Sequence, residues 1–120
     1  MKPLCNLVVP GFPKSGTSSL HEYLDLHPQI NMSRHKESHF FAIEKHWNKG
    51  WDYHNSLFNI SKDYSYYGES STIYCISEKS IERIQSSLKS PKFIFLLRHP
   101  VQRVLSHYRW LCALGLERRP

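Results

Sequence analysis

A strand, a glycine-containing loop and a helix follow one another at the start of the chain, and this unit limits the folds available to it. Residues 4–9 are a short apolar run, as in a strand covered on both faces. Gly11 and Gly16 come directly after it, and apolar positions then recur at helical spacing over 17–27. Such a unit is typical of sheets whose parallel strands alternate with helices.

The rest of the chain continues this alternation. We expect short strands at 29–32 and 66–70, a helix at 77–88, a second fully buried strand at 93–97 and a helix at 101–114, with loops and a short helix within 40–58. The sequence therefore predicts an α/β fold, a P-loop-like parallel sheet flanked by helices. With 120 residues, 40% of them hydrophobic, we expect one domain over 1–120.

Composition narrows the classes of partner. The net charge of +6 favours an anionic ligand, but the basic residues are scattered, so we expect no nucleic acid. No apolar run approaches the roughly 18 residues of a membrane span, and no export signal is visible, which favours a cytoplasmic location. The three cysteines match neither a disulfide framework nor a metal-binding pattern.

The first loop has the features of an anion site. Glycines allow the backbone to approach a ligand, and the free amides at a helix start favour negative charge. Further donors are the hydroxyls of Ser15, Thr17, Ser18 and Ser19. The alternative is a simple turn in which Thr17 or Ser18 caps the helix.

The loop differs from the nucleoside-triphosphate motif in the position of its cation. Thr17 stands where that motif has lysine, and Lys14 comes three positions earlier. A magnesium-dependent enzyme also needs an acidic residue after a neighbouring strand, whereas 93–97 is followed by Arg98. These features predict an anion site that holds no metal.

A second candidate phosphate site follows the strand at 93–97. The guanidinium of Arg98 suits phosphate oxygens, and Ser106 lies about two helical turns into the next helix, where it could donate to the same anion. Taken alone, Arg98 could equally pair with a surface carboxylate.

Together, segments 13–20 and 97–108 resemble the sulfotransferase family, whose members use 3′-phosphoadenosine 5′-phosphosulfate (PAPS). His27-Pro28, followed by Lys36-Glu37-Ser38-His39-Phe40-Phe41, looks most similar to the heparan sulfate (glucosaminyl) branch and its bacterial relatives. The resemblance spans about 7–109. It implies transfer of a sulfuryl group from PAPS, as co-substrate, to a hydroxyl or amine of a small-molecule or carbohydrate acceptor.

The resemblance also implies roles for individual residues. Lys14 would stabilise the leaving 5′-phosphate, which Ser15, Gly16, Thr17, Ser18 and Ser19 would hold, while Arg98 and Ser106 would take the 3′-phosphate. Glu37 would be the base that accepts the proton of the acceptor. His35 and His39 are competing candidates, and without the resemblance Glu37 reads as a surface residue paired with Lys36 or Arg34.

Two departures from the family pattern bear on activity. Where the heparan sulfate branch has Glu-Lys-[Ser/Thr]-Pro, this chain has Glu69-Ser70-Ser71-Thr72, so the lysine that acts at the sulfuryl group there is absent. The family domain is also about twice as long. We therefore expect a truncated domain, incomplete at its C-terminus, which in an animal enzyme would belong to the Golgi lumen. The alternatives are a non-catalytic module that binds a sulfonucleotide or polyanion, and a P-loop nucleotide kinase.

Overall fold

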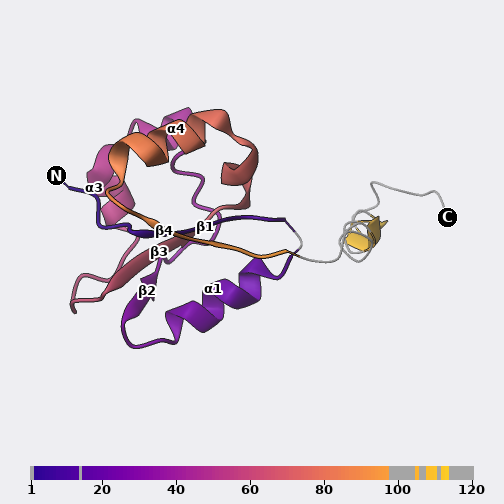
Figure 1. Cartoon of the computed structure of the whole chain (residues 1–120), viewed down its shortest axis with the longest axis horizontal. Coiled ribbons are helices and arrows are strands. Elements are labelled where there is room, and N and C mark those ends of the chain that lie inside the picture. Colours follow the sequence, from indigo (N-terminus) through magenta and orange to yellow (C-terminus); the bar gives the residue numbers. More distant parts are fainter. Residues whose placement is uncertain (1, 14, 98–104, 106–107, 111, 114–120) are drawn as a thin grey trace.

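Figure 1 shows the computed structural model of the chain, which describes residues 2–13, 15–97, 105, 108–110 and 112–113. In chain order its elements are β1 (Leu7–Gly11), α1 (Thr17–Asp25), β2 (Ile30–Met32), α2 (Glu44–Trp47), α3 (Gly50–Asn55), β3 (Tyr66–Ser70), the 3-10 helix η1 (Thr72–Ile76), α4 (Glu78–Ser87) and β4 (Lys92–Phe95).

The strands form one sheet in the order β2-β3-β1-β4, and every pairing is parallel. Helix α1 lies on one side of this sheet, and α3 and α4 lie on the other (Figure 1). The predicted α/β class is therefore confirmed. All carboxyl ends of parallel strands meet at one edge, which is where ligands bind in such sheets.

Strand β1 supplies the core on both faces, and all five of its residues are buried. Val8 faces a cluster that contains Phe40, Phe41 and Ile84. Leu7 and Val9 face the opposite cluster, beneath α1. This alternation follows from the two-residue period of a strand, and burial on both faces is as the apolar run predicts.

Most predicted elements are present, with small shifts at their ends. The strand at 66–70 is β3, the helices at 17–27 and 77–88 are α1 and α4, and the loop-rich stretch at 40–58 contains the short helices α2 and α3. Helix α4 begins after Ser77, whose side chain accepts a hydrogen bond from the amide of Ser80. Within 101–114, the described residues 105, 108–110 and 112–113 are helical; the others lie outside the described residues.

The prediction of a fully buried strand at 93–97 is wrong for the described part of the chain. Phe93 is 46% exposed, Phe95 is 51% exposed and Leu97 is 78% exposed. Strand β4 is at the edge of the sheet, with β1 as its neighbour. A continuous apolar run specifies a strand but not which faces its neighbours cover.

A fully buried carboxylate lies beneath the strand ends. Glu69 of β3 is next to Val8 in register and is completely inaccessible to solvent. Its Oε1 accepts hydrogen bonds from the hydroxyls of Ser38, Ser71 and Tyr74. Its Oε2 accepts a hydrogen bond from Nε2 of His54, and these two atoms are 2.5 Å apart. The His54 ring stacks on Phe40, with centroids 4.3 Å apart.

The ionisation of Glu69 depends on these donors. Burial by itself raises the pKa of Glu69, but the hydrogen bond and positive charge of His54, with the hydroxyls of Ser38 and Tyr74, outweigh burial and hold the pKa below its ordinary value of 4.5. Because the folded state favours the charged form, Glu69 stabilises the fold above about pH 4.5. That contribution is lost as the pH falls from there through the lowered pKa.

We predict that Gly68→Ala destabilises the chain by packing alone. A Cβ at Gly68 would lie 2.4 Å from Sδ of Met32 and 3.0 Å from Cδ2 of Leu7, an overlap that costs about 1–3 kcal/mol. Chemical denaturation measures the loss of unfolding free energy. In the double variant with Met32→Ala, Gly68→Ala should cost clearly less, since its nearest obstacle is gone; equal costs in the two backgrounds would contradict this explanation.

We predict that Glu69→Gln lowers the unfolding free energy at neutral pH by about 3 kcal/mol or more, because it breaks a buried pair and places an amide donor among donors. The matched control is Glu82→Gln on the exposed side of α4, expected within about 0.5 kcal/mol of the parent.

Thermal melts of these proteins from pH 7 down to pH 3 would show the difference between parent and Glu69→Gln shrinking below about pH 4.5. A constant difference over this range, or an unchanged melting temperature at pH 7, would contradict the role assigned to Glu69.

Candidate functional site

Three segments that follow carboxyl ends of strands line one open cavity. They come after β1, β2 and β3, which are adjacent in the sheet. The cavity has a volume of about 330 Å³ and is lined by Pro13, Gly16, Thr17, Ser18, Ser19, Lys36, Glu37 and Thr72. The glycine loop and the segment around Glu37, predicted separately from the sequence, therefore meet.

The wall formed by the start of α1 has the properties of an anion site. Gly16 is the N-cap residue, with a left-handed φ of 89°, and no side chain caps the helix. The cap by Thr17 or Ser18 that the sequence left open is therefore not formed, and the first turn contains no acidic residue. The hydroxyl oxygen of Ser15 is buried and has no hydrogen-bond partner among the described residues. Free amides and an unsatisfied hydroxyl fit a phosphate or sulfate group.

Glu37 lies on the opposite wall. Its Oε1 accepts a hydrogen bond from Nζ of Lys36 at 2.7 Å and another from the hydroxyl of Thr72 at 3.1 Å, and its Oε2 accepts from the amide of Thr72 at 2.8 Å. The side chain is 28% exposed. A carboxylate held this way, at the edge of an anion site, is placed to accept a proton.

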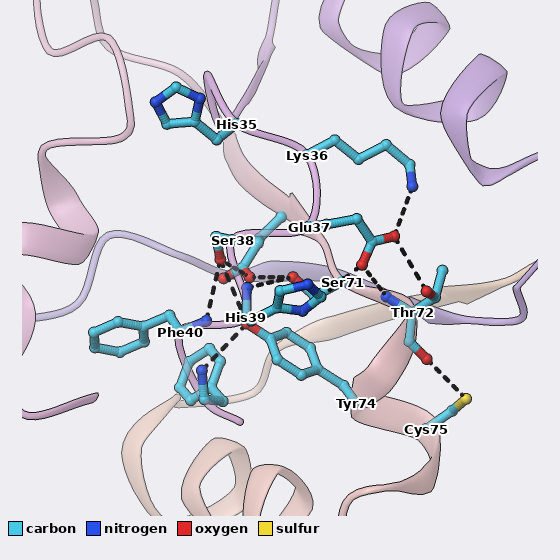
Figure 2. Close-up of polar contacts among 12 residues, drawn as sticks. His35, Lys36, Glu37, Ser38, His39, Phe40, Ser71, Thr72, Tyr74 and Cys75 are labelled. Atoms are coloured by element: carbon cyan, nitrogen blue, oxygen red, sulfur yellow. Dashed lines mark hydrogen bonds and ion pairs between the residues drawn. The ribbon is translucent and has the colours of Figure 1, made fainter. Parts of the chain in front are cut away.

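The two histidine candidates lie differently. Nδ1 of His39 is 3.9 Å from Oε2 of Glu37, and the His35 ring points away from the carboxylate (Figure 2). Neither histidine lines the cavity, whereas Glu37 does. Among the three candidate bases, the geometry favours Glu37.

The segment that carries Glu37 is tied to the buried carboxylate of Glu69. Ser38 donates to Glu69 directly, and Ser71 also donates to it. The hydroxyl of Ser71 in turn accepts a hydrogen bond from the amide of His39 at 3.1 Å (Figure 2). Glu37 and His39 both have left-handed backbones, with φ values of 60° and 56°. Such values are uncommon for residues with side chains, so the hydrogen bonds on either side hold an otherwise unfavourable path.

Two features of the site escape the sequence. Thr72 binds the carboxylate of Glu37 through its amide and hydroxyl, and its place two residues after β3 was the signal that could have revealed it. Ser70 is fully buried, and its hydroxyl bonds Nδ1 of His21 at 2.8 Å, while Nε2 of His21 donates to the carbonyl of Ser33. Nothing in the local sequence pattern of β3 indicates that Ser70 contacts His21 on α1.

The remaining predicted site residues, Lys14, Arg98 and Ser106, lie outside the described residues. Within the described ranges, no three His, Cys, Asp or Glu side chains are grouped so that they could hold a metal ion. In the same part of the chain, no helix combines the length and apolar character needed to cross a membrane.

Comparisons with known proteins agree on one family, although no protein-family model matches the chain. The chain is 32% identical over 114 residues to the membrane-associated sulfotransferase kil1 of Dictyostelium discoideum, covering 91% of the chain and 24% of that protein. It is 31% identical over 119 residues to human heparan sulfate glucosamine 3-O-sulfotransferase 5, covering 99% of the chain and 34% of that protein.

A solved structure adds the fold. The sulfotransferase from Alicyclobacillus acidocaldarius superposes with a TM-score of 0.82 at 29% identity, over the whole chain and 54% of that structure. The chain thus spans a quarter to a third of these curated relatives and about half of the structural neighbour. Sequence similarity and fold agree that this chain belongs to the sulfotransferase family, and it spans only part of the length of these relatives.

Proposed function

We propose that the chain is the N-terminal part of one sulfotransferase domain, spanning 1–120, that moves a sulfuryl group from PAPS to a hydroxyl or amine of an acceptor. The observation that carries the proposal is the cavity in which the uncapped start of α1 faces the carboxylate of Glu37. One wall suits the anionic donor and the other suits removal of a proton from an acceptor. We further propose a carbohydrate acceptor, in line with the names of the heparan sulfate relatives.

The donor would be held by backbone and hydroxyl groups of the first loop. The amides at the start of α1, the buried hydroxyl of Ser15 and the hydroxyls of Thr17, Ser18 and Ser19 are available to phosphate oxygens. Lys14, within the same loop, would stabilise the charge that develops on the 5′-phosphate as it leaves. Arg98 and Ser106 would bind the 3′-phosphate, which separates the proposed donor from ATP.

Glu37 would act as the general base. Its hydrogen bonds with Thr72 and Lys36 fix the carboxylate at the cavity wall, and a base positioned before the reaction contributes about 10²–10⁴-fold to the rate. Because Ser38 and Ser71 connect this segment to Glu69, the core of the domain sets the position of the base.

We predict that the chain binds 3′-phosphoadenosine 5′-phosphate in calorimetric titrations without magnesium. Lys14→Ala and Arg98→Ala should each weaken binding tenfold or more, since each removes a charge-assisted contact worth about 1.5–3 kcal/mol. Lys89→Ala, on the exposed surface, is the matched control and should bind like the parent. No binding by the parent would contradict the proposal, and magnesium-dependent ATP binding would favour the kinase alternative.

We predict that Glu37→Gln strongly slows transfer but leaves donor binding intact. Glutamine retains an oxygen for the amide of Thr72 but cannot take a proton, so kcat for transfer of radiolabelled sulfate from PAPS to heparan sulfate should fall about 10²–10⁴-fold. The affinity for 3′-phosphoadenosine 5′-phosphate should stay within twofold. His39→Asn provides the comparison: a larger loss of kcat in His39→Asn than in Glu37→Gln would assign the base to His39 instead.

If the unmutated chain binds the nucleotide but transfers sulfate to no acceptor, the alternative of a non-catalytic binding module would be correct. The predicted cytoplasmic location stays a prediction, to be checked by fractionation of cells that express the natural protein.

A further inference from the structure

Lys36 contributes a positive charge to the wall of the cavity that faces α1. From its position we infer that the Lys36 ammonium binds the sulfuryl oxygens of the donor and stabilises them during transfer. This inference rests on the proposed function and adds to it the group that contacts the transferred sulfur. On this inference, the positive charge at the sulfuryl group comes from the segment after β2, because the segment after β3 supplies none.

The position of Lys36 is defined by its contacts. Its Nζ lies 2.7 Å from Oε1 of Glu37, and the side chain is only 24% exposed. Lys36 and Glu37 extend to the same side of their segment, while His35 points to the other side (Figure 2). Both also line the cavity shared with the start of α1. A lysine at this place is directed into the site and is not a freely solvated surface charge.

The neighbouring strand end offers no comparable charge. After Glu69, which is wholly buried, come Ser70, Ser71 and Thr72, which contribute only hydroxyl and backbone groups. The hydroxyl of Ser70 is already engaged by His21 on α1, and that of Ser71 is engaged by Glu69. Of the cavity-lining residues within the described ranges, Lys36 is the one with a positive charge.

Pairing with Glu37 suits Lys36 to this task. A lone carboxylate beside the sulfuryl group would repel it, whereas a carboxylate paired with an ammonium leaves the local charge close to neutral. The ammonium has three donors, so Lys36 can keep one hydrogen bond to Glu37 and direct the others to sulfuryl oxygens. A preorganised cation of this kind is most effective where negative charge develops.

Lys36 would assist the transfer of the sulfuryl group itself. The acceptor oxygen or nitrogen forms a bond to sulfur while the bond from sulfur to the 5′-phosphate oxygen breaks, and the electron pair stays on that oxygen. The carboxylate of Glu37 takes the acceptor proton. Lys36 keeps its proton throughout and stabilises the three oxygens that travel with the sulfur.

Calorimetric titration with two nucleotides tests this inference. PAPS carries the sulfuryl group, and 3′-phosphoadenosine 5′-phosphate lacks it. Lys36→Met should weaken PAPS binding about tenfold and leave binding of the second nucleotide within twofold, while Lys36→Arg should retain most of the PAPS affinity. Lys45→Met, an exposed lysine on α2 outside the cavity, is the matched control and should leave both affinities unchanged.

Glu37→Gln separates direct contact from mere support of the base. If Lys36 acted only by holding or neutralising Glu37, the double variant Lys36→Met/Glu37→Gln would bind PAPS as Glu37→Gln does. On our inference Glu37→Gln retains PAPS affinity, and both Lys36→Met and the double variant lose it. An unchanged ratio of the two affinities in Lys36→Met, with melting like the parent, would overturn the inference alone. Failure of the parent to bind either nucleotide would overturn the proposed function as well.

Discussion

The hydrogen-bonded carboxylate of Glu69 is the interaction on which the arrangement of the site depends. A carboxylate without solvent exposure must be surrounded by donors, and here they come from the segment after β2, from α3 and from the segment after β3. Their convergence joins the aromatic core to the strand ends. It also determines the path of the backbone through Glu37 and His39, whose left-handed conformations need support from both sides.

Above this buried group, the cavity combines two walls of different electrostatic character. The start of α1 presents free amides and hydroxyls, with the positive end of a helix dipole behind them. The facing wall carries the paired charges of Lys36 and Glu37. Pairing allows a carboxylate to stand close to an anion without strong repulsion, so the two proposed tasks, anion binding and proton removal, are electrostatically compatible in one cavity.

Patterns in the sequence predicted where helices and strands occur better than they predicted the burial and packing of those elements. The run at 66–70 became β3, and the glycine loop became the wall that the pattern indicated. Aromatic residues within 40–58 gave a weaker signal, because Trp47, Trp51 and Tyr53 serve the core beside Phe40 from two short helices. The apolar strand at 93–97 was wrongly expected to be buried, since exposure depends on what covers its edge and faces.

The sequence by itself determined the α/β alternation and the glycine loop between β1 and α1, because these depend on spacing within a few residues, and it marked that loop as a candidate anion site. Glu37 became the candidate base only through the resemblance of a contiguous motif to the sulfotransferase family. Only the tertiary structure decided which groups meet: His54 with Glu69, Glu37 with Thr72, and His21 with Ser70 are 15, 35 and 49 positions apart. The strand order β2-β3-β1-β4 brings these residues together. Contacts of this kind follow from burial and strand register across the whole sheet, which no local pattern encodes.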